Sequence, residues 1–545
     1  MALAARIASA AVVLALLAAS PAQADDLVRP PSLDKPPAGY RLTGNQAVKI
    51  ADRAPKALRA RRAHPGSYFN VFEKSGSRWQ ISYFAPGTPA KEIAQVYVSD
   101  DTGQITEDWT GPQVAWTMAR GYPGAFGRKV NSPWVWIGLT LLFIAPFVDP
   151  RRPFRVRHLD LAVLMAFGIS VAFFNDANLD ASVPLAYPPL LYLLGRMLWI
   201  GLRRSRAPDP LKLLVPASWL VVGLLFLVGF RIGLNVTNSN VIDVGYAGVI
   251  GADRLVDGDK LWGNFPEDNQ HGDTYGPVNY AVYVPFEQVL PWGGSWDDLP
   301  AAHAAAIAFD LLCLGLLFLI GRRMRGPTLG IALAYAWAAN PFTLYAMNCN
   351  VNDALVGGLV LAAILAAASP ARRGVFIALA GMAKFAPLGL GPLFATHMRG
   401  ALRFTIGFAA VLAPCAVLVL AYGGVHEFYD RTIAYQGSRG SPFSVWGLYG
   451  WDVAQAVVQG AAVTLAVAVA FLPRRRDVVG LAALAAAVLI ALQLGVTHWF
   501  YLYLVWFLGP VSIALFGDAE PRREREPASY VEELGRLPAP AVAWR

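Results

Sequence analysis

The sequence predicts a mainly α-helical, polytopic membrane protein that carries a small α+β domain ahead of its membrane-spanning part. Hydrophobic residues make up 55% of the 545 residues and charged residues only 15%. The apolar residues come in runs long enough to cross a hydrocarbon layer about 30 Å thick. The net charge of +9 comes largely from arginines in short clusters beside these runs, as the positive-inside rule requires. The charge therefore indicates membrane topology and excludes nucleic acid as the expected partner.

The first 130 residues lack long apolar runs after their opening segment. Residues 1–24 contain Arg6, an apolar stretch and the ending Ala22-Gln23-Ala24, which is typical of a secretory signal peptide. Residues 25–130 are then expected to form an extracytoplasmic domain in which a helical segment precedes three strand-like runs, YFNVFEK, RWQISYF and IAQVYVSD. The segments GSRWQISYF and VYVSDDTGQITEDWTG resemble PepSY-type extracytoplasmic domains. A folded spacer without a ligand is the simpler interpretation of this domain.

The rest of the chain is predicted to cross the membrane about 11–13 times. Residues 131–233 hold the amino-terminal spans, 234–301 an extracytoplasmic loop, 302–517 the main transmembrane core and 518–545 a cytoplasmic tail. If the spans alternate, every arginine cluster falls on the cytoplasmic side. The predicted spans are 132–148, 159–175, 185–202, 213–233, 302–320, 327–346, 351–369, 402–422, 451–472, 478–496 and 499–516.

One segment of the core departs from this alternation. Residues 374–397 have basic residues near both ends, so the segment must re-enter and leave on the cytoplasmic side or cross twice as two short helices. Its glycines and prolines predict a broken helix, which is tolerated only where protein or a cavity covers the freed backbone groups. Lys384 then lies deep in the protein, where an ionisable side chain is a functional candidate or a structural polar contact.

The loop 234–301 is the best candidate for an active site. It contains ten carboxylates against two basic residues, Arg254 and Lys260. Asp243 stands at the lip of the apolar bundle, where desolvation raises a carboxyl pKa and suits it to act as a general base toward a hydroxyl. The alternative is that Asp243 is a helix cap or a solvated loop carboxylate.

Four further motifs follow Asp243 in a recognisable order. They are Tyr275-Gly276-Pro277-Val278-Asn279-Tyr280, Asn350-Val351-Asn352-Asp353, Ala383-Lys384-Phe385-Ala386-Pro387 and His498-Trp499-Phe500-Tyr501. Over roughly residues 213–516 this order resembles bacterial GT-C glycosyltransferases, most closely the polyprenyl-phosphate-mannose-dependent α-mannosyltransferase-like family. Cys349-Asn350 replaces the Gly-Gln of that family, and four spans rather than one precede the loop.

The resemblance implies a GT-C-like fold and a hexosyltransferase, of the mannosyltransferase type, in the cell membrane with its active face outside the cytoplasm. Its partners would be a polyprenyl-phosphate sugar donor, a glycolipid or glycan acceptor of the cell envelope, and the lipid bilayer. Asp243 would be the catalytic base, with Asp273 or Asp353 as substitutes. Substrate or phosphate would be bound by Tyr246, His271, Asp273, Tyr275, Asn352, Asp353, Lys384, Arg431, Arg439, His498 and Tyr501.

Other functions and cofactors stay open from the sequence alone. A multi-span transporter or flippase would also have buried polar residues and broken helices, although the two halves show no convincing repeat. A non-catalytic membrane scaffold would leave the loop carboxylates unexplained. The three cysteines have no metal-ligand spacing. Asp257-Gly258-Asp259 is either a divalent-cation motif or an ordinary turn, so no cofactor is firmly indicated and a divalent cation is an open alternative.

Overall fold

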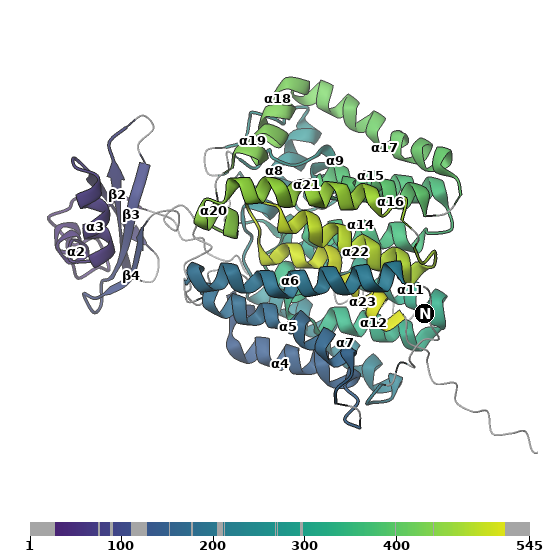
Figure 1. The fold of residues 1–545 in the computed structure, drawn as a ribbon. Coiled ribbons are helices and arrows are strands. Elements are labelled where there is room, and N and C mark those ends of the chain that lie inside the picture. The colour runs from purple at the N-terminus through teal and green to yellow at the C-terminus, as the bar shows by residue number, and fades with distance from the viewer. Residues whose placement is uncertain are drawn as a thin grey trace, which may run out of the picture.

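The computed structural model describes residues 28–74, 77–87, 91–110, 128–151, 153–175, 178–203, 211, 213–266, 269, 271–294, 298–397, 399–439, 441–472 and 474–517. The predicted signal peptide and cytoplasmic tail lie outside these residues. The architecture is a helical bundle preceded by a small α+β domain, as the sequence predicts (Figure 1).

The α+β domain packs two short helices on an antiparallel sheet. Residues 52–54 separate the helices α2 (Gly44–Ala51) and α3 (Pro55–Ala63), and Pro55 begins the second helix, a position that proline favours. The sheet has the order β1-β2-β3-β4 and includes a fourth strand that follows the expected three. Apolar side chains of both layers, such as Ala47, Trp79 and Val96, form its core. The strands are β1 (Tyr68–Lys74), β2 (Arg78–Ala85), β3 (Lys91–Ser99) and β4 (Ile105–Thr110).

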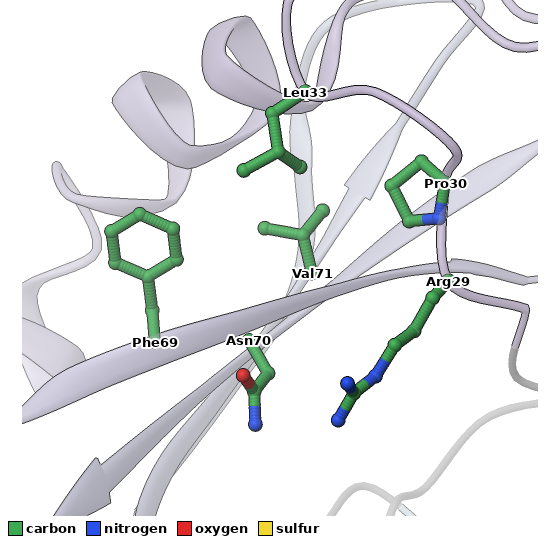
Figure 2. A pocket seen from close by; sticks show the side chains of 6 residues that line it. All are labelled: Arg29, Pro30, Leu33, Phe69, Asn70 and Val71. Atoms are coloured by element: carbon green, nitrogen blue, oxygen red, sulfur yellow. The ribbon is translucent and has the colours of Figure 1, made fainter.

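A small pocket lies beside β1 at the edge of this domain (Figure 2). Its volume is about 180 Å³, and Arg29 is the charged residue of its lining. The guanidinium of Arg29 also lies 5.8 Å from the ring centre of Phe72. The other lining residues are Pro30, Leu33, Phe69, Asn70 and Val71. This pocket has no second charged group, so it offers little for acid–base chemistry.

The bundle contains five helices that are long and apolar enough to cross a membrane, among the described residues. They are α5 (Val156–Asn175), α6 (Leu179–Leu202), α7 (Ala217–Thr237), α11 (Pro300–Arg325) and α17 (Ala401–Tyr422). Shorter apolar helices complete the bundle: α4 (Pro133–Ile144), α12 (Pro327–Ala339), α14 (Asp353–Leu365), α21 (Asp452–Ala468), α22 (Val478–Leu494) and α23 (Val505–Gly517). The chain is therefore a multi-pass membrane protein.

The helices differ in what they pack against. α22 lies against α6, α21 and α23, and nearly all of its side chains are buried (Figure 1). α7 and α17 lie at the outside of the bundle and expose large apolar side chains such as Phe226 and Leu420. Exposure of this much apolar surface to water is unfavourable, so these faces are suited to contact lipid. The inner helices of the bundle are consequently packed against other helices, whereas the outer helices present apolar side chains suited to contact with lipid tails.

One expected span is broken, and so is the segment 374–397, as its glycines and prolines predict. The run 327–346 divides at Asn340, where α12 ends and α13 (Pro341–Asn348) begins, because Pro341 cannot continue the first helix. The segment 374–397 divides into α15 (Pro370–Ala383), the 3-10 turn η6 (Ala386–Leu390) and α16 (Gly391–Thr396). A Cβ atom at Gly400 would lie 2.7 Å from Pro370, so this segment begins and ends at the same end of the bundle. Re-entry and two short crossings both have this geometry.

Candidate active site

Asp243 is held where a loop helix meets the centre of the bundle. It is the first residue of α8 (Asp243–Asp257). Just before it, the backbone N–H of Ile242 donates to the carbonyl of Cys349, at the junction of α13 and α14. Gly245 packs so closely that a Cβ atom there would lie 2.1 Å from the carbonyl oxygen of Asn350. The loop and the bundle are therefore joined backbone to backbone at the candidate base.

The carboxyl group of Asp243 has the properties expected of a general base. Its Oδ1 atom is enclosed and accepts no hydrogen bond. Burial raises the pKa of Asp243, whereas the nearby cations of Arg439 and Lys384 lower it in part. A poorly solvated carboxylate with one oxygen that accepts no hydrogen bond can accept a proton from a hydroxyl brought into its reach.

Lys384 forms the second part of the site. It stands at the end of α15, where the helix breaks, and its Nζ donates a 2.7 Å hydrogen bond to Asp353 Oδ1. The indole N–H of Trp506 donates to the same oxygen at 2.7 Å. The ammonium group also lies 5.4–5.5 Å from the ring centres of Tyr275, Tyr503 and Trp506. This aromatic setting and the ion pair hold the cation in one place.

Tyr275 reaches Lys384 because the next residue is a glycine. A Cβ atom at Gly276 would lie only 2.1 Å from the carbonyl oxygen of Met382, in the last turn of α15. The backbone of Gly276 has φ −75° and ψ 163°, which any residue adopts. The glycine is therefore required for close approach and not for its conformational freedom.

Two asparagines beside the ion pair retain unused polar atoms. Asn352, which precedes α14, donates through Nδ2 to Oδ1 of Asn279 on α9 (Pro277–Ala281). Both side chains have no exposed surface, and neither Asn352 Oδ1 nor Asn279 Nδ2 has a hydrogen-bond partner. Asp353 Oδ2 is likewise buried without a partner. A buried polar group without a partner costs about 1–3 kcal/mol, so this set of one donor and two acceptors is suited to a polar ligand.

The two loop arginines have different surroundings. Arg431 donates to Glu427 at 2.9 Å and lies 3.7 Å from Asp273 Oδ2. It belongs to the π-helical stretch η7 (Asp430–Ala434), a feature frequent at functional sites. Arg439 lies over the ring of Tyr435 at 6.0 Å, and its charge acts on Asp243 and His498. Arg439 is therefore the arginine that the fold brings to the candidate base, whereas Arg431 has carboxylate partners.

The remaining loop groups surround this centre. His271 stacks on Tyr435 with ring centres 4.6 Å apart, and burial lowers its pKa. Asp273 is fully buried and accepts a 2.7 Å hydrogen bond from the backbone of Gly263 through Oδ2. Burial raises the pKa of Asp273. His498 meets Ser441 at 2.9 Å through Nδ1, and burial lowers the pKa of His498 well below its usual value, which favours its neutral form.

Two of the predicted site residues lie in packed interiors. Tyr246 is buried, with its ring 5.8 Å from that of Trp292. The hydroxyl of Tyr501 lies 2.7 Å from the hydroxyls of both Ser170 and Ser182, on α5 and α6. These contacts explain both tyrosines as parts of the packing between elements.

Two other motifs have structural explanations. Asp310 on α11, an aspartate within a span, accepts hydrogen bonds from Arg231 on α7 and from Trp337, so it links neighbouring helices. Gly258 has φ +76° and ends α8, and Asp259 donates its backbone N–H to Arg254, so Asp257-Gly258-Asp259 forms the ordinary turn. Among the described residues, no group of three His, Cys, Asp or Glu side chains could hold a metal ion.

The sequence assigned no role to Asn279, Tyr503 or Trp506. Each is apolar or uncharged and sits in a hydrophobic stretch, where an aromatic or amide side chain is usually part of the packing. Asn279 lies inside the motif that begins at Tyr275, whereas Tyr503 and Trp506 follow the motif that begins at His498.

A family model of glycosyltransferases matches the part of the chain that contains many of the side chains of the candidate site. Residues 274–497 match the model described as Glycosyltransferase family 87. The match covers less than half of the chain and includes Asn279, Asp353, Lys384 and Arg439, whereas Asp243 precedes it. No curated protein matches the chain. The family match and the apolar helices support a membrane glycosyltransferase.

Proposed function

We propose that this protein transfers mannose from a polyprenyl-phosphate donor to a hydroxyl group of a cell-envelope glycolipid or glycan, with Asp243 as the general base. The observation that carries the proposal is the enclosed, unbonded Oδ1 of Asp243 beside the cations of Arg439 and Lys384. The match to a glycosyltransferase family over the adjoining residues supports the same chemistry.

The proposed reaction is one displacement at the anomeric carbon. Asp243 takes the proton of the acceptor hydroxyl while the acceptor oxygen forms a bond to the anomeric carbon. The bond from that carbon to the phosphate oxygen breaks, and its electron pair leaves on the polyprenyl phosphate. Arg439 would stabilise the charge gained by the leaving phosphate, because a guanidinium can donate two parallel hydrogen bonds to phosphate oxygens. The anomeric configuration is inverted.

The buried amides would bind the sugar ring. Asn279 Nδ2 can donate to one sugar oxygen, and Asn352 Oδ1 and Asp353 Oδ2 can accept from sugar hydroxyls. Lys384 then serves mainly to hold Asp353 in position through their 2.7 Å ion pair. In this assignment Arg439 binds the phosphate, whereas the two asparagines and Asp353 recognise the sugar.

The orientation proposed for the site follows from the arginines. Arg372 and Arg373 stand in the first turn of α15, and Lys384 stands at the other end of that helix. Fourteen helical residues rise about 21 Å, so the two ends are separated by most of the hydrocarbon layer. With the arginines on the cytoplasmic side, Lys384 and Asp243 face the extracytoplasmic side.

The decisive experiment measures transfer of radiolabelled mannose from polyprenyl-phosphate-mannose to envelope lipids by membranes containing each variant. Asp243→Asn keeps the size of the side chain and removes the base, so kcat should fall about 10²- to 10⁴-fold. Asp257→Asn, at the exposed end of the same helix, is the matched control and should retain activity. Unchanged transfer in Asp243→Asn would refute the assignment of the base.

A second measurement tests the sugar site. Asn279→Ala removes a buried donor, and transfer should fall about 5- to 150-fold while discrimination between mannosyl and glucosyl donors weakens. Asn264→Ala, an exposed asparagine of the same loop, should leave both quantities unchanged. Equal discrimination in Asn279→Ala and the wild type would contradict sugar recognition by this residue.

A further inference from the structure

A second cluster of basic side chains lies at the end of the broken segment 374–397 opposite the candidate base. Arg373, in the first turn of α15, has no exposed surface, and His397 at the end of α16 is 1% exposed. His397 is within electrostatic reach of Arg373 and of Arg474, which follows α21. Arg373 and Lys384 are eleven residues apart on α15, so this group lies about 16 Å from the site of the proposed reaction.

These side chains retain nitrogen atoms that form no hydrogen bond. Arg373 donates from Nη1 to the carbonyl of Ala367, but its Nε and Nη2 have no partner. Arg474 donates to the carbonyl of Val469 at 2.6 Å and to Thr396 at 2.7 Å, and its Nε has no partner. His397 Nδ1 is also buried without a partner. Three side chains thus leave four enclosed nitrogen atoms unbonded.

The charge of this group is not balanced by the protein around it. Among the described residues, the carboxylate within reach of His397 is that of Asp477. That carboxylate is already bound by Arg475 and by the backbone N–H of Gly480. Arg476 adds another positive charge nearby. A buried guanidinium without a counterion is unfavourable, so the structure calls for an anion at this position.

We propose that Arg373, Arg474 and His397 form a binding site for a phosphate group, separate from the site of sugar transfer. Guanidinium N–H groups match the tetrahedral oxygens of phosphate, and arginine can donate two of them in parallel. Leu402, five residues after His397, is 75% exposed, and Phe471, three residues before Arg474, is 79% exposed. The phosphate is therefore that of an anionic phospholipid headgroup at the membrane edge, or free inorganic phosphate.

The test uses the full-length protein in lipid nanodiscs made of phosphatidylcholine alone or with added phosphatidylglycerol. Retained lipid is counted by native mass spectrometry, and thermal unfolding is measured in parallel. A separate arm titrates inorganic phosphate into the protein in detergent. Wild type should retain phosphatidylglycerol selectively, or be stabilised by phosphate, and either result supports the site while identifying its source.

The variants decide whether these residues carry the binding. Arg373→Gln should weaken it about 10- to 100-fold, whereas Arg372→Gln, the exposed neighbouring arginine, should not. The Arg474 side chain is only half-buried, so Arg474→Gln provides the same test if Arg373→Gln fails to fold. The proposal is overturned if neither phosphate source binds, or if Arg373→Gln or Arg474→Gln binds as well as Arg372→Gln.

Discussion

Replacing Gly276 by alanine should damage the candidate site while leaving the fold in place. The added Cβ would lie 2.1 Å from the carbonyl oxygen of Met382, whereas ordinary contact begins at 3.4 Å. Because Met382 contributes backbone of α15, the loop must move away by about 1.3 Å, taking Tyr275 from its place over Lys384. A displacement of about 1 Å in a catalytic site can reduce the rate about 10²-fold.

The assay compares kcat for mannosyl transfer in Gly276→Ala with that in Gly293→Ala. Gly293 belongs to the same loop and has nothing within 4 Å of its Cβ position, so this control carries the same chemical change without the collision. Thermal unfolding in detergent shows whether both variants are folded. Equal kcat values for the two folded variants would refute the reasoning that close approach at Gly276 positions the site.

Three further predictions concern charges and buried polar groups. Arg439→Gln removes a cation that lowers the pKa of Asp243, so the acid limb of the pH–rate profile should move to higher pH; an unmoved limb would contradict their coupling. Arg231→Met should destabilise the bundle by about 3–5 kcal/mol, because Asp310 is left buried and unpaired, and Arg231→Met/Asp310→Leu should recover most of the thermal stability. Asp100→Ala removes the acceptor of the Trp79 indole N–H and should make the α+β domain more sensitive to limited proteolysis of the full chain, whereas Asp101→Ala should not.

Much of the architecture was predictable because it depends on local composition. The order of a small α+β domain and a helical bundle is confirmed. Apolar runs and the alternation of apolar and polar residues in strands can both be recognised from neighbouring residues alone. The fourth strand and the helix break at Asn340 were missed. The first lies in a segment rich in charged and polar residues, and the second lies inside an apolar run whose hydropathy does not change at Pro341.

The candidate site was predictable only in part. Asp243 and Lys384 were identified because an ionisable side chain near or within apolar sequence is unusual. Tyr501 was selected for its place beside His498, yet its hydroxyl is held by Ser170 and Ser182 in a helix interface. The sequence does not indicate that either serine contacts Tyr501, because Ser170 and Tyr501 are more than three hundred positions apart.

Local composition and charge are enough to show that the chain crosses a membrane, which ends of its helices carry arginine, and where ionisable groups interrupt apolar sequence. Which of those groups meet depends on how distant segments pack together. Packing brings Arg439 near Asp243 and Arg431 into an ion pair with Glu427. It also pairs Lys384 with Asp353 and leaves the Asn279 side chain with an unused donor. Hydropathy is a sum over neighbouring residues, whereas partners and unpaired atoms depend on contacts between segments that packing alone brings together.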